Sequence, residues 1–381
     1  MLGIILIVVL FVSFIAAVDW WLGSVGSTSD FFVGVEFAYS NNVADLKDLV
    51  DKVKNYTNLF VIGSIEITFN QTALDEACDY VVGSGLHLIV FFTDSEMYNY
   101  TIVKDNQIYN YTTFDWMVDA KQKYGDMLLG IYRYDEPGGN QLDRGPSLLI
   151  ENATDYVDMA AKFTNTLKYI IGFYLNYTDE VFTADYGLYW FDYKARYSAV
   201  LAEFGWNHSR PLHVGLCRGA AKAYNKDWGA IVTWTYNDTP YLESGEELYS
   251  DLKLAYNTGA KYAVVFSYPV IGHYGILTEE HFDAMKDFVN YIHSNPREQG
   301  VIQGEVAYVL PEDYGFGFRN PRDKIWGLWD ADGLSEKVWN DVNMLIDQYD
   351  SRLDIVYSDP EGWGAVKSRY SQLFFWNETI A

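Results

Sequence analysis

Apolar, β-rich runs alternate with amphipathic helical segments along most of this chain, and this alternation constrains the fold more than any other feature. Repeated strand–helix units are typical of a parallel sheet covered by helices. The expected strands are 31–39, 59–68, 87–94, a run from Leu128 that ends at Asp135-Glu136, 181–191, 199–207, 229–238 and 261–269. Eight consecutive units between residues 30 and 296 predict an α/β fold, a (β/α)8 TIM barrel, with an open doubly wound sheet as the alternative.

Two segments interrupt or follow this repeat. The polar, Tyr- and Asn-rich stretch 95–112 predicts a hairpin inserted after the third strand. Residues 297–381 change in character: a strand at 305–310 is followed by a glycine- and aromatic-rich loop, a helix at 335–349 and two further short strands. We expect this part to form a small C-terminal α/β domain packed on the barrel.

The N-terminus predicts export. Residues 2–18 are apolar without interruption, which is long for the core of a signal peptide and short for a membrane span. We interpret residues 1–29 as a signal peptide or an N-terminal membrane anchor followed by a short linker. Whether the segment is cleaved stays open, and both alternatives place the protein outside the cytoplasm, secreted or at the cell surface.

Acceptor sequences for N-glycosylation agree with an exported glycoprotein. The Asn-x-Ser/Thr pattern without a central proline occurs nine times, at Asn55, Asn70, Asn99, Asn110, Asn152, Asn176, Asn207, Asn237 and Asn377. Such sites are used only when they lie on the surface of an exported protein. The two cysteines, Cys78 and Cys217, fall on different predicted helices, so we expect two buried thiols and no disulfide.

Charge and the lack of several motifs exclude some classes of function. Lys and Arg number 27 against 52 Asp and Glu, so the net charge is 27 − 52 = −25, and such a surface repels nucleic acid. The chain has no HExxH, no CxxC and no clustered histidines, so no metal site is predicted. No glycine-rich phosphate loop follows the first strand and no GxSxG is present, so we expect neither a nucleotide cofactor nor a serine hydrolase.

Acidic and aromatic residues recur where the predicted strands end. The buried run from Leu128 leads into Asp135-Glu136, and a Pro-Gly-Gly turn follows immediately. Ligands bind at the carboxyl ends of strands in parallel barrels, so these side chains are expected around one mouth. The acids expected there include Glu36, Glu66, Asp135, Glu136, Asp185 and Glu203, and the aromatics include Tyr39, Tyr189, Trp190, Trp206, Trp234, Tyr236 and Tyr268.

Carboxylates interleaved with aromatic rings suit the hydrolysis of glycosidic bonds. One carboxyl protonates the leaving oxygen, a second stabilises or attacks the anomeric carbon, and aromatic faces stack on sugar rings. We therefore expect Glu136 as general acid and Glu203 as a fallback nucleophile, with Glu36 and Asp185 binding substrate. Five of the aromatics are expected to stack on sugar rings, as sugar platforms: Tyr189, Trp190, Trp206, Trp234 and Tyr236. The alternative for each acid is a buried ion pair, with Arg133 as the candidate partner.

The barrel resembles the (β/α)8 glycoside hydrolases, whose acid/base glutamate ends strand four, the position that Glu136 occupies. Those enzymes usually carry a nucleophilic glutamate at the end of strand seven, where this sequence has none, and Glu243 is the nearest substitute. The adjacent Asp135-Glu136 resembles the pair of barrel hexosaminidases, which implies that Asp135 orients an acetamido group of the substrate. The layout, a barrel followed by a small α/β part, also resembles a β-galactosidase family with an amidotransferase-like domain.

Two other classes of function remain alternatives. The density of glycosylation sequences and the missing strand-seven glutamate fit a non-catalytic surface glycoprotein that is structural or binds glycans. A polysaccharide lyase or transferase would use the same acids. The expected ligand is a carbohydrate in each case, while self-association and membrane anchoring through residues 2–18 are left open.

Overall fold

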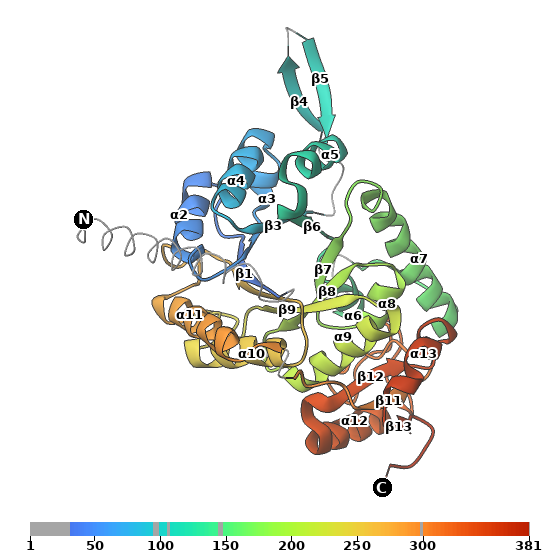
Figure 1. The fold of residues 1–381 in the computed structure, drawn as a ribbon. Helices are drawn as coiled ribbons and strands as arrows, with labels where there is room; N and C mark the ends of the chain where they lie inside the picture. Colours follow the sequence, from blue (N-terminus) through green and yellow to red (C-terminus); the bar gives the residue numbers. More distant parts are fainter. Residues whose placement is uncertain (1–30, 94–98, 105–106, 144–147, 298–299, 381) are drawn as a thin grey trace, which may run out of the picture.

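The computed structural model describes residues 31–93, 99–104, 107–143, 148–297 and 300–380 (Figure 1). Eight parallel strands close into a barrel in the order β1-β10-β9-β8-β7-β6-β3-β2, which confirms the predicted (β/α)8 fold. The barrel strands are β1 (Phe32–Phe37), β2 (Leu59–Ile62), β3 (His87–Phe92), β6 (Leu128–Arg133), β7 (Val181–Asp185), β8 (Ala199–Phe204), β9 (Asp227–Val232) and β10 (Tyr262–Ser267).

Alternation along each strand divides the core into two layers. Side chains such as Val61, Tyr132 and Leu201 fill the barrel interior, while their sequence neighbours pack outward against the helices. Because the interior is packed with side chains, space for a ligand is available only at the ends of the barrel. The helices that cover it are α2 (Val43–Val53), α3 (Ile65–Thr68), α4 (Gln71–Gly83), α5 (Thr113–Tyr124), α6 (Pro137–Asp143), α7 (Tyr156–Tyr174), α8 (Tyr189–Lys194), α9 (Arg210–Tyr224), α10 (Gly245–Asn257) and α11 (Glu279–Ser294).

Three predicted strands extend six residues beyond the observed ones. The stretch 229–238 ends as a strand at Val232. The stretch 59–68 ends as a strand at Ile62, and the Ser64 side chain then caps the short helix α3. The stretch 181–191 ends as a strand at Asp185, and helix α8 begins at Tyr189. In the latter two stretches a short polar interruption, Gly63-Ser64 or Asp185-Tyr186-Gly187, separates two apolar runs. Short apolar runs do not by themselves distinguish a strand from a buried turn of helix.

The predicted insertion is an antiparallel hairpin of β4 (Asn99–Lys104) and β5 (Gln107–Thr112). Figure 1 shows it projecting outward from the body of the barrel next to α5. Thr112 ends the hairpin and forms a capping box with Asp115, so helix α5 begins directly after it.

The C-terminal part forms a small parallel sheet in the order β12-β11-β13, from β11 (Val306–Leu310), β12 (Leu353–Tyr357) and β13 (Gln372–Phe375), with α12 (Ser335–Tyr349) and α13 (Pro360–Val366). Helix α9 packs directly on β12 because Gly215 and Gly219 have no side chains. A Cβ at either position would lie 2.7 or 2.6 Å from a β12 carbonyl oxygen. Arg218 of α9 pairs with the buried Asp354 at 2.8 Å, which joins the sheet to the barrel.

Several expectations about the surface can be compared with the structure. Cys78 and Cys217 are buried free thiols, as predicted. Seven asparagines of the glycosylation sequences, 55, 70, 152, 176, 207, 237 and 377, are exposed, while the side chains of Asn99 and Asn110 are not described. The apolar segment 2–18 lies outside the described residues. Of the helices that are described, none has both the length and the apolar character of a membrane span.

Candidate active site at the C-terminal end of the barrel

A cavity of about 630 Å³ opens at the carboxyl ends of the barrel strands. Five carboxylic acids line it, from β1, α3, β8 and the segment after β6: Glu36, Glu66, Asp135, Glu136 and Glu203. Its walls include the rings of Phe91, Tyr132, Phe266 and Tyr268. Among the described residues that line the cavity there is no lysine, arginine or histidine, so its field is strongly negative.

Strand alternation explains how two of the acids face inward. Glu36 follows Gly34 on the inner face of β1, and Glu203 follows Leu201 on the inner face of β8. Both side chains are 5% exposed and still line the cavity. In each case a carboxyl group occupies an interior position of an apolar strand. Burial of such a group destabilises the fold unless the group has a partner or a function.

The backbone after β6 is strained where it delivers Glu136. Tyr134 and Glu136 have φ values of 60° and 50°, in the left-handed region that non-glycine residues rarely adopt. The Glu136 N–H donates to the Ala184 carbonyl at 3.1 Å, which fixes this turn to the neighbouring strand. Helix α6 begins at the next residue, Pro137. Strain of this kind is concentrated at functional sites.

Glu136 and Glu203 share a side-chain hydrogen bond across the cavity floor. Burial first, and then the charges of Glu136 and Asp135, raise the pKa of Glu203 well above its ordinary value. Burial also raises the pKa of Glu136, although the hydrogen bond from Glu203 opposes that rise. The pair therefore holds one proton, mainly on Glu203, because two carboxyl groups joined by a hydrogen bond are not both ionised.

This contact does not fit the role of nucleophile that the sequence suggested for Glu203. An acid and a nucleophile on either side of a glycosidic bond stand about 5 Å apart or more. Two carboxyls joined by a hydrogen bond leave no room between them for the bond to be cleaved. The geometry is that of a proton-sharing pair.

Asp135 and Glu36 lie beside this pair. The Tyr132 hydroxyl points into the barrel and donates a hydrogen bond to Asp135. Burial first, and then the charge of Asp135, raise the pKa of Glu36 to about 8. Tyr132 was missed in the sequence, although its position two residues after the buried Gly130 on β6 follows the inward alternation.

Asp185 does not face the cavity. It is fully buried at the end of β7 and accepts hydrogen bonds from the backbone N–H groups of Gly138, Gly139 and Gly187 at 2.6–3.1 Å. The prediction that it binds substrate is therefore wrong. Its carboxylate supplies acceptors for the start of α6 and thereby holds the segment that carries Glu136.

Two of the five predicted sugar platforms belong to the core. Tyr189 and Trp190 begin helix α8 and are 1% and 2% exposed. The Trp190 ring packs against Tyr224 and against Tyr357 of the C-terminal sheet, and the Tyr189 hydroxyl bonds to His213. The prediction fails for both because the chain turns into a helix after Asp185, and these rings then point toward neighbouring helices.

The other three aromatics lie outside the acid-lined cavity. Trp206 and Tyr236 line a neighbouring surface cavity of about 740 Å³, together with the sequon residues Asn207 and Asn237. Trp234 stacks on Tyr268, with ring centroids 6.1 Å apart, and so supports a ring that does line the acidic cavity. The aromatic residues that line the acidic cavity are Phe91, Tyr132 and Phe266 on β3, β6 and β10, together with Tyr39 and Tyr268, which follow β1 and β10 and were expected at this mouth.

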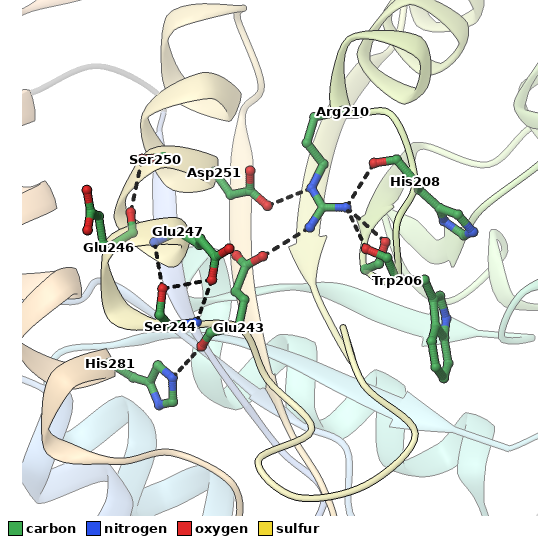
Figure 2. A network of polar contacts seen from close by, with 11 residues as sticks. Trp206, His208, Arg210, Glu243, Ser244, Glu246, Glu247, Ser250, Asp251 and His281 are labelled. Atoms are coloured by element: carbon green, nitrogen blue, oxygen red, sulfur yellow. Dashed lines mark hydrogen bonds and ion pairs between the residues drawn. The ribbon is translucent and has the colours of Figure 1, made fainter.

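Arg133 and Glu243 also differ from expectation. Arg133 has its guanidinium over the Tyr174 ring and donates a hydrogen bond to the Thr93 carbonyl, and it is not among the described residues that line the cavity with Glu36 and Glu203. Figure 2 shows Glu243 in a separate network, where Arg210 bonds to Glu243 at 3.0 Å and to Asp251 at 2.7 Å. Glu243 therefore ties the loop before α10 to α9 and does not replace a strand-seven nucleophile.

Within the described residues, no group of three or more His, Cys, Asp or Glu side chains is arranged to hold a metal ion. The polar side chains that line the cavity include the five carboxyl groups and the hydroxyl-bearing side chains of Tyr39, Tyr132 and Tyr268.

Comparison with known proteins assigns the chain to no family. No protein-family model matches the chain, and no curated protein matches it. A glycoside hydrolase family 99 endo-α-mannosidase from Bacteroides thetaiotaomicron is 10% identical, with a TM-score of 0.42 over 70% of this chain and 99% of that chain. A pneumococcal exo-β-D-N-acetylglucosaminidase module is 10% identical, with a TM-score of 0.41 over 69% and 83%. A D-psicose 3-epimerase from Clostridium cellulolyticum is 11% identical, with a TM-score of 0.37 over 69% and 99%.

Proposed function

We propose that this protein is a glycoside hydrolase that acts on extracellular or cell-surface carbohydrate. The observation that carries the proposal is the proton-sharing pair Glu136–Glu203 on the floor of an open cavity with aromatic walls. Cleavage of a glycosidic bond requires a general acid that protonates the leaving oxygen, and a carboxyl group that keeps its proton near neutral pH can do this. Aromatic walls match the apolar faces of sugar rings.

The two members of the pair have different roles in this proposal. Glu136 is half-buried and lies nearer to solvent, so it transfers the proton to the glycosidic oxygen, as general acid. Glu203 is buried, stores the proton and returns it to Glu136. Asp135, held by the Tyr132 hydroxyl, is the carboxylate that stabilises positive charge at the anomeric carbon.

The test is a comparison of wild type with Glu136→Gln, Glu203→Gln and Asp135→Asn on a panel of aryl glycosides. We expect each to lower kcat/KM by about 100-fold or more, the usual contribution of general acid catalysis. Glu246→Gln removes an exposed acid on α10, far from the cavity lining, and should keep full activity. Full activity of Glu136→Gln would refute the proposed mechanism.

Export and glycosylation are part of the proposal. It is supported by the exposure of all seven sequon asparagines whose side chains are described. Glycopeptide mass spectrometry of protein from its native source should find glycans on several of these positions. Unmodified asparagines throughout, in protein from the intact cell surface, would contradict this part.

A non-catalytic, glycan-binding surface protein is the second candidate. The hydrogen bond between Glu136 and Glu203 favours it, since this pair cannot bracket a glycosidic bond. Wild-type protein that binds oligosaccharides but cleaves no glycoside in the panel would support this candidate over the first.

A further inference from the structure

The Glu36 carboxyl lacks a partner within the described part of the chain. It is 5% exposed and lines the cavity, and no hydrogen bond or ion pair joins it to any described residue. Among the other buried acids, Asp185 accepts backbone N–H groups and Asp354 pairs with Arg218 and Lys222. The Asp192 carboxyl is also buried and accepts no hydrogen bond from an N–H or O–H group of the described residues, but it lies in the core beside Asp185 and does not line the cavity. A buried carboxyl without a partner is costly, so its position at the cavity wall indicates a partner supplied by a ligand.

The surroundings of Glu36 determine the chemistry of that partner. Asp135 places a second carboxyl beside it, and the Tyr132 hydroxyl is already donated to Asp135. Glu203 of β8 and Glu66 of α3 add further acids to the same cavity. Gly63 of the adjacent strand end leaves the space that the carboxyl occupies, because a side chain there would collide with it. A hydrogen-bond donor that carries positive charge fits this environment best.

We propose that the cavity recognises a sugar that carries a protonated amino group, and that its ammonium binds between Glu36 and Asp135. The saccharide part of this inference rests on the proposed function. An N-acetylated sugar offers one N–H and no charge, so it leaves Glu36 without a counter-charge. A uronic acid or sulfated sugar is repelled by the same carboxyls. The resemblance to hexosaminidases implies that Asp135 orients an acetamido group of the substrate. In this proposal a protonated amino group binds there in its place.

Proton uptake by the empty cavity supports the same conclusion. Burial and the charge of Asp135 raise the pKa of Glu36 to about 8, so the empty cavity relieves its negative charge by binding a proton. The titratable groups that line the cavity together with Glu36 are the carboxyls of Glu66, Asp135, Glu136 and Glu203 and the phenols of Tyr39, Tyr132 and Tyr268, and none of them is a base. An ammonium ion in the cavity stabilises the ionised form of Glu36, so binding near pH 6.5 releases a proton.

The experiment is calorimetric titration of the full chain with two ligands of one scaffold, a glucosamine tetramer and its fully N-acetylated counterpart. Titrations run at pH 6.5 and about 0.15 M salt, in two buffers of different ionisation enthalpy, so that released protons are counted. We expect wild type to bind the amine about tenfold tighter or more, with release of up to about one proton. Glu36→Gln should reduce the preference to within about threefold and abolish most of the release, while Glu246→Gln should retain both.

Three results would overturn the inference. The first is acetylated tetramer that binds as tightly as the amine. The second is an unchanged amine preference in Glu36→Gln with a cooperative melting transition, which shows that the variant is folded. The third is spermidine that binds as tightly as the glucosamine tetramer, since this shows a general cation site without sugar recognition.

The outcome is separable from that of the proposed reaction. Cleavage of neutral aryl glycosides without any amine preference overturns this inference alone. If the protein cleaves no glycoside but prefers the amine, and this preference depends on Glu36, the result contradicts the proposed hydrolysis alone.

Discussion

Replacement of Glu36 by glutamine should stabilise the protein, and the gain should grow as the pH rises. Glu36 is buried without a partner in the described structure, and its pKa is raised from 4.5 to about 8. Between these values the unfolded chain has lost the proton while the folded chain keeps it. Unfolding then releases a proton, so the free energy of unfolding falls as the pH increases.

The magnitude follows from the same two values. At about 1.36 kcal/mol per pH unit, the interval between 4.5 and about 8 corresponds to at most about 5 kcal/mol. Water in the cavity screens part of this, so we expect a gain of about 2–5 kcal/mol at pH 8.5 relative to pH 4.5. Glutamine has nearly the same shape and does not ionise, so the free energy of unfolding of Glu36→Gln lacks this pH-dependent loss.

Urea unfolding of wild type, Glu36→Gln and the surface control Glu246→Gln at pH 4.5 and 8.5 measures this difference. The unfolding midpoint of Glu36→Gln should approach that of wild type at the lower pH and exceed it at the higher pH. A Glu36→Gln variant that is less stable than wild type at pH 8.5, or a difference independent of pH, would show that Glu36 has a stabilising partner in the fold.

Three further variants test the structural assignments. Asp185→Asn leaves at least one buried N–H of α6 without an acceptor, so unfolding should need about 1–3 kcal/mol less by urea titration, and unchanged stability would contradict the role assigned to it. Trp190→Ala removes a ring of the core and should cost about 3–5 kcal/mol in the same assay, whereas a sugar platform at the surface would cost little. Arg218→Met leaves Asp354 with Lys222 as its one remaining cationic partner among the described side chains, and should lower stability by about 3 kcal/mol or more. Thermal unfolding that matches wild type would disprove this role for the pair.

The barrel and several of its acids were predictable because the signals are local. Alternating apolar runs and helical segments identify the strands, and period-two alternation places Glu36 and Glu203 on inner faces. The segment after Leu128 ends in two acids at the open end of its strand, as expected from the Pro-Gly-Gly that follows.

Other assignments failed where two apolar runs are separated by only a short polar interruption. Tyr189 and Trp190 follow Asp185-Tyr186-Gly187, and this interruption does not by itself show that the second run is a helix. Once α8 forms, both rings turn into the core. Asp185 is likewise an acid at a strand end, but the backbone N–H groups of α6 occupy its oxygens.

The sequence alone determined the architecture, because strand and helix periods depend on residues that are close neighbours in the chain. It also placed Glu36, Asp135, Glu136 and Glu203 at the barrel mouth, although it placed Asp185 there as well. Only the tertiary structure decided which of them touch: Glu136 meets Glu203, Tyr132 bonds to Asp135, and Glu36 faces the cavity without a described partner. These relations depend on the closure and stagger of the barrel, which bring together strands that lie far apart in the sequence.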